Sequence, residues 1–187
     1  FAMFFLLCAD GVNDLKNGLA LDPCVGAFVK VPATGEKGRL YGAVTTAEIA
    51  ELVKSTSLPF VIKGVLSRVD ARKCLDAGVQ GMVLSHHNGR LESAVPPLMI
   101  LPEILEETKG KVPLFVDCSL QSGLDVFKAL ALGADGVIIA RPFVNMVYGG
   151  GAEGIQVYVD KLKAELADTM AMCGAHSLAD IDRSMVR

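Results

Sequence analysis

The sequence lacks both an excess of basic charge and a long apolar run. Its 187 residues carry 18 Lys and Arg against 21 Asp and Glu, so the net charge is −3 and no positive field favours nucleic acid. No apolar run approaches the ~18 residues of a membrane span. The opening FAMFFLLCA has no basic segment before it, so we expect a buried strand there rather than a signal peptide.

Cysteine is sparse and is not arranged for a metal or for disulfides. The five cysteines are widely scattered, without a CxxC pair: Cys8, Cys24, Cys74, Cys118 and Cys173. An odd and scattered set favours neither a disulfide framework nor a zinc site, so no metal site is predicted. We expect most of these thiols to act as small apolar side chains in a reducing cytoplasm.

Short apolar runs, by contrast, are abundant, and helical patterns separate them. After the opening segment, four continuous runs are typical of strands covered on both faces: 59–63 (PFVIK), 81–85 (GMVLS), 113–117 (PLFVD) and 136–140 (GVIIA). Periodicity and capping residues predict helices at 45–55, 67–77, 97–108 with its regular part starting at Pro102, 122–132 before Gly133, 151–172, and a short one at 177–185. This alternation predicts βαβ units, a parallel sheet and a single domain over 1–187, with 11–42 as one long loop.

Polar side chains follow the predicted strands at the points where these end. Asp10 follows the first strand, and the next four lead to Lys63, His87, Asp117 and Arg141. In parallel α/β proteins, ligands bind at the carboxyl ends of the strands. Five polar groups at five strand ends therefore predict one functional site at this edge of the sheet, which we call the mouth.

The segment 83–90, VLSHHNGR, suits acid–base chemistry at this mouth. His87 could accept a proton near neutral pH, and Arg90 could grip a carboxylate at two points. Lys63 could stabilise negative charge. From the histidine pair alone, the simpler interpretation is favoured, in which one of His86 and His87 is solvated and the other is structural.

The segment 117–142 suggests an anion site. It runs from a strand end through a Ser/Gly turn and a helix to the last strand and Arg141. Barrels often bind phosphate with the loops after their last two strands, through backbone N–H groups and a helix N-terminus. The alternative is an ordinary βαβ unit whose glycines only make turns.

Four motifs, in their order and spacing, resemble the C-terminal half of the FMN-dependent α-hydroxy-acid oxidases and dehydrogenases, such as glycolate oxidase and lactate oxidase. The motifs are PFVIKGV, VLSHHNGR, FVDCSLQSGLDVFKALALGADGVIIARP and TMAMCGAHSLADI. The resemblance covers residue 45 to the end. It implies a TIM (β/α)8 barrel, here an incomplete barrel covering strands 4 to 8, that binds FMN and oxidises a small 2-hydroxy acid to the 2-oxo acid.

By position, the resemblance also implies roles for the polar residues. His87 matches the active-site base, Arg90 the arginine that binds the substrate carboxylate, and Asp10 the aspartate that orients the histidine. Lys63 matches the lysine beside flavin N1 and the C2 carbonyl. The other implied FMN contacts are Ser85, Asp117, Ser119, Gln121, Ala140 and Arg141, the last at the phosphate.

The chain departs from the family's motifs in its loops. The departures are His86 for Asn, Asn88 for Gly, Leu91 for Gln, Cys118 and Ser119 for two glycines, Gln121 for a phosphate-binding arginine, and Ala140 for Gly. The lost charge weakens the expected FMN site, and the substrate need not be a simple 2-hydroxy acid.

Family members carry three more strands before the opening segment, so we expect an arc with two open edges. We therefore expect a fragment, or a subunit that is completed by the missing N-terminal half or that forms a homo-oligomer. Two other functions stay open. One is an FMN- or phosphate-binding barrel with isomerase-like chemistry, and the other is a non-catalytic partial barrel that serves as an interaction piece.

Overall fold

The computed structural model describes residues 5–8, 45–87, 89 and 93–187; the predicted loop 11–42 lies outside them. The described elements are, in order, β1 (Phe5–Cys8), α1 (Thr46–Lys54), β2 (Val61–Val65), α2 (Arg68–Asp76), β3 (Gly81–Leu84), α3 (Pro97–Thr108), β4 (Leu114–Val116), α4 (Gly123–Ala131), β5 (Gly136–Ile139), α5 (Arg141–Cys173) and the short 3₁₀ helices η3 (Leu178–Asp180) and η4 (Arg183–Met185).

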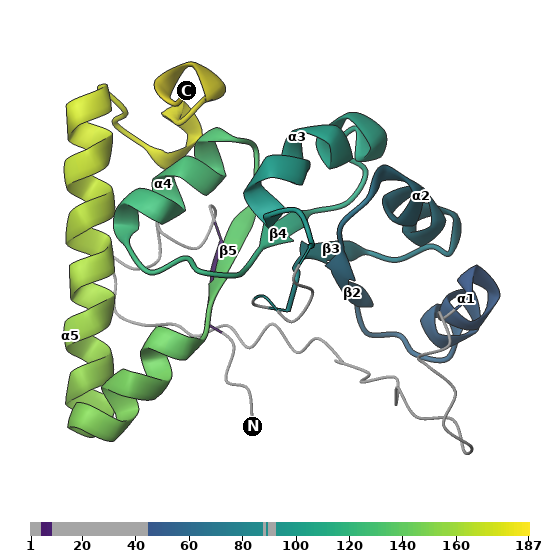
Figure 1. Cartoon of the computed structure of the whole chain (residues 1–187), viewed down its shortest axis with the longest axis horizontal. Helices are drawn as coiled ribbons and strands as arrows, with labels where there is room; N and C mark the ends of the chain where they lie inside the picture. Colours follow the sequence, from purple (N-terminus) through teal and green to yellow (C-terminus); the bar gives the residue numbers. More distant parts are fainter. Residues whose placement is uncertain (1–4, 9–44, 88, 90–92) are drawn as a thin grey trace.

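The five strands form one sheet in the order β1-β5-β4-β3-β2. Strands β2 to β5 pair in parallel, each with the next in the chain, and α2, α3 and α4 connect them. Helices α1 to α4 lie in an arc along one side of these strands (Figure 1). The predicted βαβ arrangement is therefore confirmed, as a partial parallel α/β sheet.

The first strand runs in the opposite direction to the predicted one. β1 pairs antiparallel with β5, with Cα partners from Phe5↔Ile139 to Cys8↔Gly136. An exposed strand edge offers unpaired backbone groups, and β1 occupies that edge of β5. The carboxyl end of β1 consequently lies where β5 begins, opposite the carboxyl ends of the parallel strands. The strand before Asp10 therefore does not lead to the predicted mouth.

Helix boundaries follow the predicted capping residues. Thr45, Ser67 and Ser122 are the N-caps of α1, α2 and α4, and the side chain of each accepts a hydrogen bond from the N–H three residues later, at 3.1 to 3.2 Å. α4 is followed by Gly133, whose φ of 98° is the left-handed value expected of a glycine after a helix.

Three predicted helices end or begin elsewhere. α3 is unbroken from Pro97 to Thr108, with Pro102 inside it on an exposed position where water can replace the lost backbone bond. α5 begins at Arg141 rather than 151, and Gly151 (φ 55°, ψ −136°) joins its two helical parts at the bend in Figure 1. The predicted helix 177–185 is the pair of short 3₁₀ helices η3 and η4.

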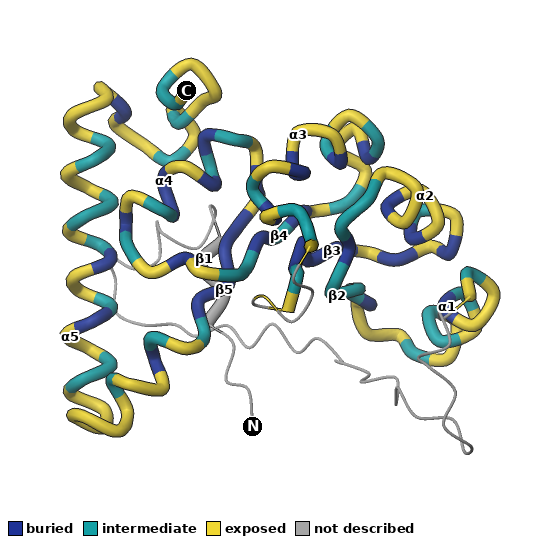
Figure 2. The backbone as a smooth tube through the Cα atoms, in the orientation of Figure 1, coloured by how far each residue is buried: buried dark blue, intermediate teal, exposed yellow. Residues whose placement is uncertain are grey.

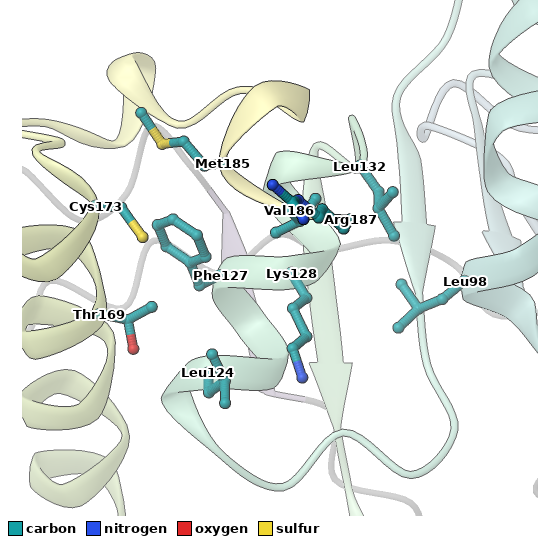
Figure 3. Close-up of a pocket in the computed structure, with 10 residues that line it drawn as sticks. All are labelled: Leu98, Leu124, Phe127, Lys128, Leu132, Thr169, Cys173, Met185, Val186 and Arg187. Atoms are coloured by element: carbon teal, nitrogen blue, oxygen red, sulfur yellow. The ribbon is translucent and has the colours of Figure 1, made fainter.

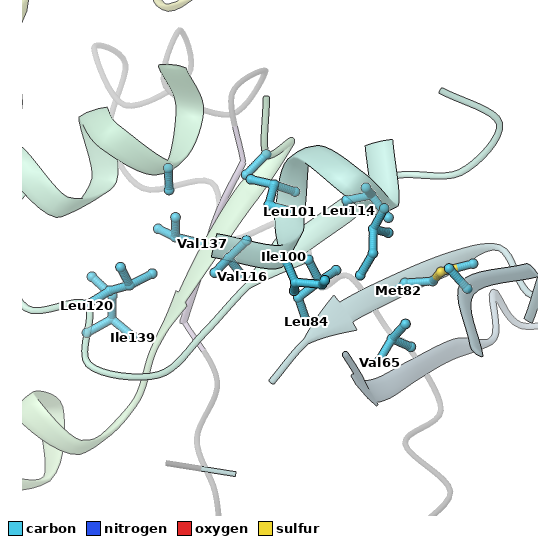
Figure 4. Close-up of a cluster of buried hydrophobic side chains, with 14 of the residues drawn as sticks. Val65, Met82, Leu84, Ile100, Leu101, Leu114, Val116, Leu120, Val137 and Ile139 are labelled. Atoms are coloured by element: carbon cyan, nitrogen blue, oxygen red, sulfur yellow. The ribbon is translucent and has the colours of Figure 1, made fainter. Parts of the chain in front are cut away.

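The hydrophobic core lies between the parallel strands and the helices. Alternate residues of β3, β4 and β5 are at most 2% exposed and form one cluster with α3 residues (Figure 4): Met82, Leu84, Leu114, Val116, Val137 and Ile139. Figure 2 shows the buried segments gathered on these strands, with exposed positions on the outer sides of the helices. Full burial of one such side chain stabilises the fold by about 1.5–3 kcal/mol.

Candidate active site

The polar residues predicted at the strand ends lie at one edge of the sheet. Lys63 is in β2, Ser85 directly follows β3, Asp117 directly follows β4, and Arg141 follows β5. The register pairs Lys63 with Val83, and strand side chains alternate between the two faces. Lys63 and Ser85 therefore share the face of the sheet that is turned away from the helices.

A network of polar contacts joins three neighbouring strands at this edge. Lys63 Nζ donates a hydrogen bond to Ser85 Oγ at 2.6 Å and forms an ion pair with Asp117 Oδ2 at 2.6 Å. The side chains of this pair are only 25% and 13% exposed. Cys118 Sγ donates to Asp117 Oδ1 at 2.7 Å and lies 3.5 Å from Ser85 Oγ. The opposite charge and the hydroxyl hold the ammonium group at the strand ends.

His87 is attached to this network through Ser85. Ser85 is fully buried, and its Oγ accepts a hydrogen bond from the His87 N–H at 3.1 Å. The ring of His87 lies against Gly64, since a Cβ added at Gly64 would be 2.9 Å from His87 Cε1. His87 is exposed and has a left-handed backbone, with φ 54°. The structure therefore brings together Lys63, Ser85, His87 and Asp117.

His86 has a different environment from His87. Its Nδ1 accepts a hydrogen bond from the Gly89 N–H at 2.9 Å, so the proton of the neutral ring is on Nε2. This contact ties His86 to the local turn. The other two residues predicted for catalysis, Asp10 and Arg90, lie outside the described residues.

The loop after β4 has an unusual backbone. Cys118 and Ser119 have φ values of 73° and 65°, in the left-handed region that favours glycine. The resemblance places glycines at these two positions, so the backbone keeps the form that glycine would adopt. Ser119 is exposed at the edge of the sheet, and Cys118 is partly buried beside Asp117.

The N-terminus of α4 already binds two carboxylates. Asp125 Oδ2 accepts from the N–H groups of Gln121 and Ser122, both at 3.0 Å, and Glu165 Oε2 accepts from the Gly123 N–H at 2.9 Å. Burial alone would raise the pKa of Asp125, but these hydrogen bonds outweigh it and hold that pKa below its usual value. The N–H groups of Gln121, Ser122 and Gly123 are therefore already bonded to carboxylates at this helix end, and the predicted anion site in segment 117–142 stays a prediction.

The N-terminus of α5 is different. Its N-cap is Ala140, which provides no side-chain cap, and its first turn contains no acidic residue. Arg141 is exposed at its first position. Helix N-termini attract anions through their free N–H groups and dipole, and Arg141 adds a full positive charge. The end of α5 beside β5 is thus the helix end suited to an anion.

Another groove, of about 340 Å³, lies among the outer helices (Figure 3). Its lining is mostly apolar and comes from α3, α4, α5 and the C-terminal residues: Leu98, Leu124, Phe127, Lys128, Leu132, Thr169, Cys173, Met185, Val186 and Arg187. None of these residues belongs to the polar network at the strand ends. The groove is therefore separate from the candidate active site.

Sequence reasoning missed two features of this site. The contact between Gly64 and the His87 ring joins β2 to the turn after β3, and the glycine after Lys63 in PFVIKGV was its visible signal. The hydrogen bond between Gly123 and Glu165 spans 42 residues and has no local signal in the sequence.

In the part of the chain that the structure describes, no helix has the length and apolar character to cross a membrane.

Comparison with known proteins supports the resemblance. The model of a family described as FMN-dependent dehydrogenase matches residues 29–187. The peroxisomal (S)-2-hydroxyacid oxidase GLO3 of Arabidopsis thaliana is 40% identical over 141 residues, which are 75% of this chain and 39% of that relative. Glycolate oxidase of Spinacia oleracea is 37% identical over 178 residues, covering 95% of this chain and 46% of the relative. The chain thus spans less than half the length of these curated relatives.

Solved structures give the same result for the fold. Mandelate oxidase with (S)-4-hydroxymandelic acid superposes with a TM-score of 0.72 at 36% identity, over 76% of this chain and 41% of that one. A mandelate oxidase variant with a monooxide FMN adduct also has a TM-score of 0.72, at 35% identity, over 84% of this chain and 49% of that one. The predicted fold class, an incomplete (β/α)8 barrel, is confirmed.

Proposed function

Because the chain belongs to the FMN-dependent dehydrogenase family, we propose that it forms the catalytic edge of an enzyme that oxidises a small 2-hydroxy acid to the 2-oxo acid with FMN. The observation that carries the proposal is the network of Lys63, Ser85 and Asp117, with His87 attached, at the carboxyl ends of β2, β3 and β4. Similar relatives named (S)-2-hydroxyacid oxidase and L-lactate oxidase support the substrate class.

The residues at this edge fit FMN in their charges. Arg141 and the open N-terminus of α5 suit the phosphate, and the Lys63 ammonium group suits the polar side of the ring. The other proposed contacts are Ser85, Asp117, Ser119, Ala140 and the exposed side chain of Gln121. The backbone of Gln121 is committed elsewhere, since its N–H binds Asp125 and its carbonyl accepts from the Tyr158 hydroxyl at 2.8 Å.

Residues of this chain would bind the substrate and accept its proton. His87 accepts the proton that leaves the substrate, which an imidazole does well near neutral pH. Arg90 pairs with the substrate carboxylate. The role of Asp10 in orienting His87 stays a prediction, because β1 ends at the opposite edge of the sheet. Lys63 stabilises the negative charge that develops beside it. When bound, FMN would accept the two electrons that leave the α-carbon.

The test is anaerobic bleaching of the flavin colour by a 2-hydroxy acid such as glycolate or lactate. We expect the chain with FMN to bleach and His87→Ala to bleach at least 10²-fold more slowly, on the order of a lost general base, while still binding FMN. His86→Ala is the matched control and should bleach at nearly the unchanged rate. Bleaching that persists in His87→Ala would show that another group is the base.

Two outcomes would favour the alternative functions. A chain that binds FMN but is not bleached by any 2-hydroxy acid would favour an FMN barrel with isomerase-like chemistry. A chain that binds no FMN would favour a non-catalytic partial barrel.

Completion by a missing N-terminal half or within a homo-oligomer, which native mass spectrometry would detect, stays a prediction. The cytoplasmic location also stays a prediction, and two similar relatives are named peroxisomal.

A further inference from the structure

Gly64 occupies a position that strand formation does not explain. It lies inside β2, where glycine weakens a strand, and the register with β3 shifts between its neighbours Lys63 and Val65. Its φ is +111°, a conformation that residues with side chains rarely adopt. The least strand-like residue of β2 thus directly follows the cation of the candidate active site.

The space above Gly64 contains the ring of His87. A Cβ added at Gly64 would lie 2.9 Å from Cε1, 3.8 Å from Nε2 and 3.9 Å from Nδ1 of His87. Non-bonded carbon atoms pack best at about 3.5–4.0 Å, so the first of these distances is a collision. Only the bare glycine backbone leaves the ring where it is.

A hydrogen bond to Ser85 fixes the backbone of His87 independently of Gly64. Its N–H donates to Ser85 Oγ, and Ser85 is fully buried and bonded to Lys63. With the main chain held, the ring can avoid a methyl group at position 64 only by rotating its side-chain torsions. That rotation would carry the ring nitrogens away from the edge where the substrate binds.

We propose that Gly64 is a positioning residue for His87, and that its bare backbone is the surface on which the imidazole rests beside Lys63. The proposal rests on the proposed function, because it takes His87 to be the base. A methyl group at position 64 would displace the ring by on the order of 1 Å. A displacement of that size costs on the order of 10²-fold in rate.

The kinetic test compares Gly64→Ala with Gly78→Ala. Gly78 is also left-handed, with φ +80°, but a Cβ there would meet only Val53 Cγ1 at an ordinary 3.9 Å. Gly64→Ala should slow anaerobic bleaching by about 10²-fold with unchanged FMN affinity, and Gly78→Ala should leave the rate nearly unchanged. In a His87→Ala background, Gly64→Ala should add no further slowing. Independent, multiplying effects would overturn the proposal.

A second measurement does not need a working enzyme. The chain has three histidines, so the Cε1–H resonance of His87 in the FMN-free chain can be assigned by its loss in His87→Ala. Gly64→Ala should shift this resonance and its titration midpoint and leave those of His86 and His176 in place. An unmoved His87 resonance would refute the proposal. A shifted resonance in a chain that no 2-hydroxy acid bleaches would support Gly64's role and refute the proposed function.

If Gly64→Ala does not fold, the double variant Gly64→Ala/His87→Ala tests the proposal instead. If the ring is what the added methyl meets, then Gly64→Ala/His87→Ala should recover a folded chain with a higher melting temperature than Gly64→Ala. Equal failure of the double variant would mean that the backbone at φ +111° alone requires glycine. The role assigned to Gly64 would then be wrong.

Discussion

Two consecutive residues after β4 have a strained backbone. Cys118 and Ser119 are both left-handed without being glycine, which costs roughly 1–2 kcal/mol for each. The thiol of Cys118 gains contacts to Asp117 and Ser85, at 2.7 and 3.5 Å, whereas Ser119 is exposed. Strain of this kind is commonly kept where a ligand is bound.

Replacing Ser119 by glycine should therefore stabilise the chain. Glycine removes the left-handed cost but loses more entropy on folding, so we expect a net gain of about 0.5–1 kcal/mol in the free energy of unfolding. Urea unfolding measures this. Ser67→Gly is the control, because Ser67 has φ −147° and should lose a few tenths of a kcal/mol. A loss of stability in Ser119→Gly would mean that position 119 is not strained.

The thiols of Cys74 and Cys173 should differ in reactivity. Burial raises the pKa of Cys74 to about 11, whereas Cys173 is exposed at the end of α5. Only the thiolate reacts, and at pH 8 a pKa of 11 leaves roughly one thousandth of Cys74 in that form. Iodoacetamide at pH 8 should label Cys173 in the folded chain and Cys74 only in urea, as peptide mapping would show. Fast labelling of folded Cys74 would contradict its burial.

Among the elements, α4 depends on contacts at its first turn. Ser122 and Asp125 form a reciprocal capping box, and Glu165 of α5 adds the bond to Gly123. Gly123 also lets the two helices touch, since a Cβ there would lie 2.3 Å from the Leu166 backbone nitrogen. The same contacts that start the helix therefore attach it to α5.

Asp125→Asn should destabilise the chain by about 1 kcal/mol at pH 7, because a charged N-cap partner of several N–H groups is lost. The pKa of Asp125 is lower in the folded state, so its contribution is present above the ordinary pKa of about 3.9 and disappears as the pH falls through the folded value. Unfolding at pH 7 and under acid measures both effects. Asp168→Asn, on an exposed position of α5, is the control. A deficit that grew under acid would contradict the assignment.

Local signals explain which elements the sequence predicted. Apolar runs and capping residues located β2 to β5 and α1 to α4, since both depend on neighbouring residues. The direction of β1 depends on its partner 130 or so residues away. The glycines at 149–151 concealed the first part of α5, because glycine is a weak helix former.

For the molecule as a whole, the candidate active site is a single edge shared by four strands. The sequence located Lys63, Ser85, Asp117 and Arg141 because each stands at the end of a clear strand. It could not show that Asp125 and Glu165 fill the N-terminus of α4, because occupancy depends on packing between helices. Sequence alone therefore places the expected anion site only near the last two strands, and its exact position stays a prediction.

FMN should raise the melting temperature of the chain, since a ligand that binds only the folded state stabilises it by about 2.7 kcal/mol at 100 times its Kd. Arg141→Ala should weaken FMN binding by roughly 10- to 100-fold, the value of one charged hydrogen bond of 1.5–3 kcal/mol. Lys128→Ala removes an exposed cation on α4 that lines the separate groove, and it should bind FMN normally. Equal weakening in both variants would indicate a general charge effect rather than a phosphate site.

The two outer edges of the sheet are not equivalent. β1 already occupies the backbone groups of β5, whereas in the described residues no strand pairs with the free side of β2. A further strand could dock beside β2 at once, but beside β5 it would first have to peel away four paired residues. A larger sheet would consequently grow first from the free edge of β2. Pairing at β5 would be the slower step, because the added strand would compete with β1.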